Sequence, residues 1–121
     1  MKKPAYSYYT DRMWRDFIPR WEWNEQNNAP PNRLLPIQST NYDVCLLFWN
    51  DLTQDQRDII KTVTCTEHEQ IGWKVGELTQ RLQISPGAVW TIAFRIGRVT
   101  ALQRGLIDYK KGEDRADGQR I

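Results

Sequence analysis

The chain has 121 residues, of which 40% are hydrophobic and 26% are charged. This length allows one compact domain, or a small domain with extensions, and excludes two large domains. No apolar run follows the lysines after Met1, and the longest uninterrupted apolar stretch is Val44 to Trp49, so we expect neither a secretory nor a membrane-spanning segment. Cys45 and Cys65 are therefore expected to be reduced thiols in a cytoplasm.

The net charge of +2 is unevenly divided along the chain. Residues 31–73 hold three cationic and six acidic side chains, whereas residues 74–111 hold seven cationic and two acidic ones. This asymmetry fits a polyanionic partner, although a solvated basic face is common on helical proteins. The chain also has six tryptophans, whose rings require a core, a partner or a nucleic acid to cover them.

Residues 1–40 are interpreted as a Trp-rich arm followed by a linker. Apolar side chains at helical spacing predict a short helix that begins near residue 11, and Pro19 should end it near Ile18, before an aromatic corner at "RWEW". Residues 24–36 contain three prolines and predict a loop or linker.

Residues 41–111 are expected to form the main helical domain. Apolar side chains recur at helical spacing over residues 41–50, and "TQDQRDIIKTVTC" then begins with Thr53 and Gln56, which match a capping box. Residues 74–83 predict a further amphipathic helix. Ser85 is a good N-cap and Pro86 suits the first helical position, so a helix is expected from Pro86 to about Tyr109. Residues 112–121 form a polar tail.

The predicted fold is thus a mostly α, small helical bundle with a helix-turn-helix over residues 74–109. That motif requires two short helices, a turn of three or four residues, and a second helix with an exposed N-terminal side. The apolar residues expected to join the two helices are Leu78, Leu82, Ile84, Val89 and Ala93. The residues expected to face outward are Pro86, Gly87, Trp90, Thr91 and Arg95. Gly97 and Gly105 weaken the second helix, and either ends it or lets another helix approach.

The stretch "GELTQRLQISPGAVW" resembles the fourth conserved region of bacterial sigma factors. The matching positions are Glu77, Leu78, Leu82, Ile84, Ser85 and Val89. The preceding "LTQDQRDII" resembles the helix that supports the motif in that family. Thr79 stands where the family usually has alanine and Gln83 where it usually has glycine, which suggests a less tight turn.

The layout of arm, linker, supporting helices and C-terminal motif is similar to that of small phage transcription regulators. Those it most resembles are the Q-type late antiterminators of lambdoid phages and related late-gene activators. The resemblance implies a DNA-binding regulator in the cytoplasm of a bacterial host, with duplex DNA and host RNA polymerase as partners. The alternative is a protein that inhibits or modulates a host complex without reading DNA sequence. A homodimer is left open, because a single motif covers little DNA.

The candidate DNA contacts begin with Arg95 and Arg98, which could reach guanine or phosphate but could equally be solvated charges on a helix. Trp90 and Phe94 could contact thymine methyl groups or a protein. A pair spaced by four residues is more often buried by a neighbouring helix, and we expect the Trp-rich arm to cover them. The full set of candidates is Lys74, Arg81, Pro86, Gly87, Trp90, Thr91, Phe94, Arg95 and Arg98.

Other chemistry is less supported by the residues. Trp14, Trp21 and Trp23 could stack on single-stranded bases, but the acids between them favour packing or partner binding. Cys65 and His68 have a spacing that a metal accepts, yet a structural zinc site needs four ligands. A Cys–His nucleophile would need a third group to orient the base. We therefore expect no metal, no cofactor and no enzymatic activity.

Overall fold

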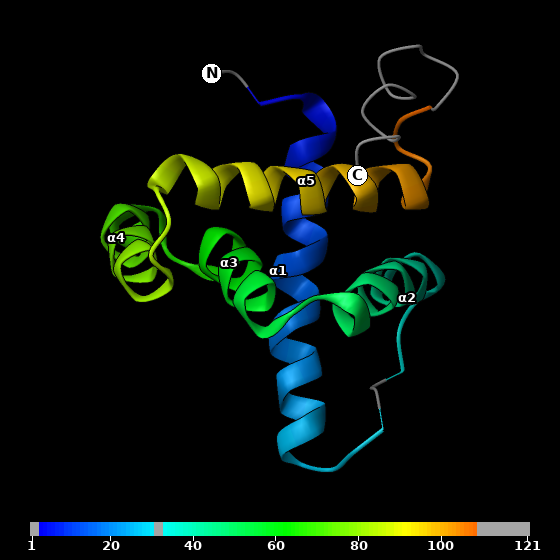
Figure 1. The fold of residues 1–121 in the computed structure, drawn as a ribbon. Coiled ribbons are helices and arrows are strands. Elements are labelled where there is room, and N and C mark those ends of the chain that lie inside the picture. The colour runs from blue at the N-terminus through cyan, green and yellow to red at the C-terminus, as the bar shows by residue number, and fades with distance from the viewer. Residues whose placement is uncertain (1–2, 31–32, 109–121) are drawn as a thin grey trace.

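The computed structural model describes residues 3–30 and 33–108, which form a small bundle of α-helices with no β-strand in that part of the chain (Figure 1). This confirms the predicted fold class. The polar tail expected over residues 112–121 lies outside the described residues. The elements are α1 (Ala5–Gln26), α2 (Pro36–Asp51), α3 (Gln54–Cys65), the 3-10 turn η1 (His68–Gln70), α4 (Ile71–Leu82) and α5 (Pro86–Arg104).

Helix α1 differs most from the sequence-based prediction. It runs unbroken for 22 residues through Pro19, so the prediction of a short helix ending near Ile18 is wrong. Proline removes one backbone hydrogen bond, but buried side chains on both sides of it hold the segment helical: Trp14 and Ile18 precede it and Asn24 follows it. The segment interpreted as an arm is therefore the helix against which α2, α3 and α5 all pack (Figure 1).

An aromatic cluster fills the space between α1 and α2. Trp49 of α2 has its ring centroid 6.2 Å from that of Trp14, 5.6 Å from Phe17 and 5.2 Å from Trp21. Phe17 also lies 4.8 Å from Tyr42, measured between centroids. Tilted and edge-to-face pairs at these separations stabilise a core beyond the area that they bury. Packing thus accounts for three of the six tryptophans.

Arg57 of α3 closes this cluster at the C-terminal end of α2. Its guanidinium carbon lies 4.7 Å from the Trp49 ring centroid and 5.5 Å from that of Trp21. Its Nε and Nη2 atoms donate to the Trp49 carbonyl at 3.1 and 2.8 Å. A cation at a helix C-terminus also complements the helix dipole. One side chain therefore links three helices.

Helix α5 crosses α1 close to Gly97 and Thr100 (Figure 1). The indole Nε1 of the fully buried Trp14 donates to Thr100 Oγ1 at 3.1 Å, and Thr100 donates in turn to the Ile96 carbonyl at 2.6 Å. A Cβ atom at Gly97 would lie 3.3 Å from Thr10 Oγ1, so this glycine permits the close approach of α1. Gly105, at φ 84°, ends α5, and the helix does not continue to Tyr109 as predicted.

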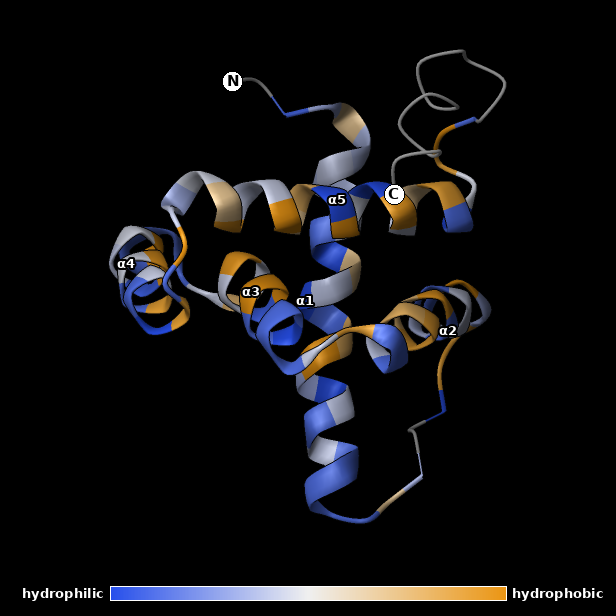
Figure 2. Cartoon of the chain, viewed as in Figure 1, coloured by the Kyte–Doolittle hydropathy of each residue, from blue (hydrophilic) through white to orange (hydrophobic). Residues whose placement is uncertain are grey.

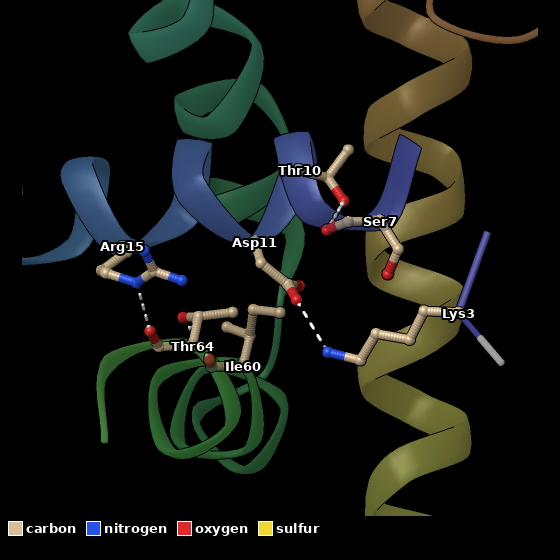
Figure 3. Close-up of polar contacts among 7 residues, drawn as sticks. All are labelled: Lys3, Ser7, Thr10, Asp11, Arg15, Ile60 and Thr64. Carbon is tan, nitrogen blue, oxygen red and sulfur yellow. Dashed lines mark hydrogen bonds and ion pairs between the residues drawn. The ribbon is translucent and has the colours of Figure 1, made fainter. Parts of the chain in front are cut away.

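Polar contacts tie α1 to α3 along one side (Figure 3). Arg15 Nε donates to the Thr64 carbonyl at 3.1 Å, near the end of α3, and Thr64 Oγ1 donates to the Ile60 carbonyl at 2.7 Å. Lys3 and Asp11 form an ion pair at 3.1 Å beside them. As with Arg57 and α2, a guanidinium supplies a donor to the unpaired carbonyls of a helix C-terminus.

The remaining helix boundaries partly confirm the sequence analysis. Thr53 and Gln56 form the predicted capping box at the start of α3. The Thr53 N–H donates to Gln56 Oε1 with 2.9 Å between nitrogen and oxygen, and the Gln56 N–H donates to Thr53 Oγ1 at 3.2 Å. Helix α2 begins at Pro36 instead of residue 41, because proline fits the first helical position and the Gln38 side chain accepts from the Leu35 N–H at 3.1 Å. Helix α4 begins at Ile71, three residues earlier than predicted.

Candidate functional site

Helices α4 and α5 form a helix-turn-helix with a three-residue turn, Gln83 to Ser85. Gln83 adopts the left-handed conformation at φ 59° and ψ 44°, and the Ile84 N–H donates back to the Thr79 carbonyl at 3.3 Å. This is the helix end that glycine adopts most readily. Gln83 thus adopts the left-handed conformation without being the glycine usual in the sigma-like motif. Ser85 Oγ accepts from the Ala88 N–H at 3.1 Å, which confirms the predicted N-cap of α5.

The two faces of α5 differ sharply in burial. Its inner face is buried, with Val89, Ala93 and Ile96 in the core. Figure 2 shows hydrophobic segments of α5 and α3 on the sides that face each other. The predicted outward residues of the first two turns are all exposed: Pro86, Gly87, Trp90, Thr91 and Arg95. The sequence therefore predicted the orientation of this helix correctly, because apolar positions at helical period mark the core side.

Trp90 and Phe94 are not covered, so the expectation that the N-terminal segment buries them is wrong. Their exposed fractions are 40% and 44%. The physical reason is the position of the crossing: α1 packs on α5 at Gly97 and Thr100, beyond these rings. Tyr6 of α1 approaches, with its ring centroid 6.4 Å from that of Phe94. The sequence analysis missed Tyr6, although three tyrosines close to one another near the N-terminus were a visible signal.

The four cationic candidates differ in their surroundings. Arg95 is exposed and forms no ion pair within the part of the chain that the structure describes. Arg98 is half-buried. Arg81 pairs with Asp58 of α3 at 2.9 Å, and Lys74 lies 3.6 Å from Glu77. Since carboxylates neutralise two of the four cations, the basic character of this surface is weaker than the sequence count indicates, and Arg95 is its most available charge.

The tryptophans of α1 have distinct environments. Trp14 is fully buried and Trp21 packs against the core, as the packing interpretation predicts. Trp23 is 51% exposed. Stacking of all three rings on single-stranded bases is therefore excluded for this conformation, since Trp14 offers no accessible face.

The cysteine and histidine positions do not assemble a reactive centre in the described structure. Burial, and secondarily the Asp16 carboxylate, raises the pKa of Cys45, and burial raises the pKa of Cys65. Both shifts disfavour the nucleophilic thiolate. Within residues 3–30 and 33–108, no three His, Cys, Asp or Glu side chains gather to hold a metal ion. In the same residues, no helix combines the length and hydrophobicity that a membrane crossing requires.

A pocket of about 420 Å³ lies between α1 and α2. Its floor includes Phe17 and Tyr42, and its rim carries Arg12, Asp16 and Arg20. No residue of α5 lines it. The pocket therefore contributes nothing to the exposed face of α5, which is the strongest candidate site.

No protein-family model, no curated protein and no solved structure matches this chain.

Proposed function

We propose that this chain is a transcription regulator of the phage type that binds duplex DNA through the exposed face of α5. In this proposal the first turns of α5 enter the major groove. Arg95 contacts a base edge or a phosphate, while Gly87 and Thr91 allow close approach of the helix. Lys74, Arg81 and Arg98 add phosphate contacts at the edges. Binding requires positioning alone, and no chemical step.

One observation carries the proposal: the N-terminal half of α5 is packed on one side and exposed on the other. A recognition helix needs this combination, because its packed face fixes the orientation while its free face reaches the groove. The three-residue turn and the resemblance of "GELTQRLQISPGAVW" to the fourth region of sigma factors support the same role.

Fluorescence anisotropy with a labelled duplex of mixed sequence, at low and at moderate salt, tests the affinity. We expect affinity to fall steeply with salt, and Arg95→Ala to weaken binding several-fold and reduce the salt slope by about one. Gly87→Glu should abolish binding. Only Ser85 Oγ lies near the added Cβ, at 3.8 Å, and an acid suits a helix N-terminus, so the fold should be retained.

Arg12→Ala is the matched control, because Arg12 is an exposed arginine that lines the pocket between α1 and α2. It should change affinity less than twofold. Selection from a pool of randomised duplexes then tests sequence reading, with enrichment expected for the wild type and lost in Arg95→Ala. The proposal is wrong if the wild type fails to bind at low salt, or if Arg95→Ala and Gly87→Glu bind like it.

A second candidate is a modulator that contacts a host complex such as RNA polymerase through the same face. The exposure of both Trp90 and Phe94 favours it, since exposed aromatic pairs are enriched at the centres of protein interfaces. Binding to purified bacterial RNA polymerase should then be lost in Trp90→Ala and Phe94→Ala. Trp73→Ala should retain it, because Trp73 is an exposed tryptophan on α4. Polymerase binding without any affinity for DNA would favour this candidate over the first.

A further inference from the structure

Helix α2 exposes large apolar side chains outside its core-facing side. Its inner side packs Tyr42, Cys45 and Trp49 into the core. Away from that side lie Ile37 and Leu47, which are 65% and 52% exposed. The half-buried Val44 and Phe48 lie between and beside them and pack in part against the core. At 3.6 residues per turn these four residues lie along one stripe. Hydrophobic residues accordingly cover much of α2 in Figure 2.

The two ends of this stripe carry opposite charges. Arg33 precedes α2 and Asp51 is its last residue. In the described part of the chain neither forms an ion pair. They cannot meet within one molecule, because sixteen helical residues separate them by roughly 22 Å or more at 1.5 Å per residue. A second copy of the chain packed antiparallel on α2 would supply a partner of opposite charge for each of them.

We propose that the outer face of α2 is the interface of a homodimer in which two α2 helices pack antiparallel about a two-fold axis between Thr40 and Val44. Positions at equal distances from residue 42 then face each other. Ile37 contacts Leu47 and Phe48 of the second copy, and Arg33 meets Asp51 of the second copy. The two-fold axis forms each contact twice, as in any isologous interface.

The charges of α2 favour a second copy over other occupants. The helix contains Asp43 and Asp51 and no lysine or arginine, so it does not suit a nucleic acid or an acidic protein. A basic amphipathic partner would leave Arg33 facing like charge, whereas a second copy pairs both Arg33 and Asp51. Asp43 is exposed at the side of the stripe, where both copies of its carboxylate stay hydrated. The dimer does not depend on the proposed DNA binding.

Sedimentation velocity of the full chain over a wide range of protein concentration tests the interface. The wild type should shift from the monomer mass toward twice that mass as concentration rises. Leu47→Glu and Ile37→Glu should each weaken the dimer at least tenfold, because they place a carboxylate on the apolar stripe. Trp73→Glu, the same kind of change at an exposed apolar side chain of α4, should dimerise like the wild type. Far-UV circular dichroism confirms that each variant is folded.

A charge exchange tests the antiparallel geometry directly. Arg33→Asp and Asp51→Arg should each weaken dimerisation several-fold, and the double variant should recover wild-type affinity, because the pair is restored in reverse. Neither change opposes the helix dipole, so folding should be retained. A wild type that stays monomeric, a dimer insensitive to Leu47→Glu, or a double variant as weak as the sum of its single variants would each overturn the proposal.

Discussion

In two regions of this molecule an arginine occurs together with aromatic rings. The rings are packed in the interior in one region and exposed in the other. In the interior, Arg57 lies over Trp21 and Trp49 and donates twice to the Trp49 carbonyl. On the outer face of α5, Arg95 stands beside Phe94 in the sequence, is exposed, and forms no ion pair among the described residues. The same residue types are fully engaged in one region and accessible in the other.

The difference between the two regions shows that composition alone does not reveal which tryptophans and arginines are accessible to a partner. Tryptophans and arginines are typical of nucleic-acid surfaces and protein interfaces, and the excess of cations over residues 74–111 suggested a polyanionic partner. Three of the six tryptophans pack in or against the core, whereas Trp23, Trp73 and Trp90 are exposed. The rings of Trp90 and Phe94 lie with the exposed Arg95 on the second helix of the helix-turn-helix, so we place the candidate partner surface there.

The largest expected effect on stability comes from replacing one tryptophan in each region with alanine. Trp14→Ala should lower the free energy of unfolding by about 3–5 kcal/mol, because it empties a fully buried site and removes the donor to Thr100 Oγ1. Trp90→Ala should lower it by about 1 kcal/mol, since the residue is 40% exposed and lies outside the core cluster. Urea unfolding followed by far-UV circular dichroism measures both. Equal losses would show that Trp90 belongs to the core after all.

The second test replaces one arginine in each region. Arg57→Ala removes two charge-assisted hydrogen bonds and two ring contacts, and should cost about 2–4 kcal/mol of stability. Arg57→Lys should recover little of this, because an ammonium lacks the planar fork that stacks and donates together. Arg95→Ala should stay within about 0.5 kcal/mol of the wild type. The same urea titrations measure all three, and a marked loss in Arg95→Ala would reveal a hidden structural contact.

The third test uses pH and concerns the interior alone. Burial raises the pKa of Cys45 in the folded state, so above the ordinary thiol pKa of about 8.5 the unfolded chain loses this proton while the folded chain keeps it. Stability should therefore fall as pH rises, by up to about 1.4 kcal/mol per pH unit from this group. Urea titrations from pH 7 to 10, with reductant, should show a shallower decline in Cys45→Ala. Parallel declines in both proteins would contradict the assignment.

The sequence predicted local features well wherever a short pattern determines the structure. Thr53 with Gln56, Ser85 with Pro86, and the apolar period of α5 each act over one or two helical turns, so their consequences follow from neighbouring residues. The exposure of Gly87, Thr91 and Arg95 was predictable for the same reason. Their role as DNA contacts stays a prediction.

The sequence could not predict what depends on distant residues. Pro19 locally favours a helix end, but packing of α1 against three other helices keeps the helix intact. The exposure of Trp90 and Phe94 depends on where α1 crosses α5, which Gly97 and Thr100 set by contact with residues almost ninety positions away. Arg81 and Asp58 pair across two helices, which no local pattern indicated.

The smallest expected effect concerns the turn that presents the α5 face. Gln83 holds a left-handed conformation that costs a residue with a side chain roughly 1 kcal/mol, whereas Gly105 relieves the same requirement at the other end of α5. Gln83→Gly should therefore raise the free energy of unfolding by about 0.5–1 kcal/mol, the gain being limited by loss of the Gln83 Nε2 bond to the Gln80 carbonyl. Gly105→Gln should lower it by about 1 kcal/mol. Thermal and urea unfolding measure both.

The Gln83→Gly variant also tests whether the turn before α5 serves the fold alone or belongs to the candidate DNA surface. If Gln83 serves only the fold, Gln83→Gly gains stability and leaves the affinity for duplex DNA unchanged, because every contact residue on α5 keeps its place. If the glutamine side chain itself reaches the duplex from the turn, stability rises while affinity falls. The second result would extend the candidate surface from α5 into the turn and would explain why a strained residue stands where glycine fits better.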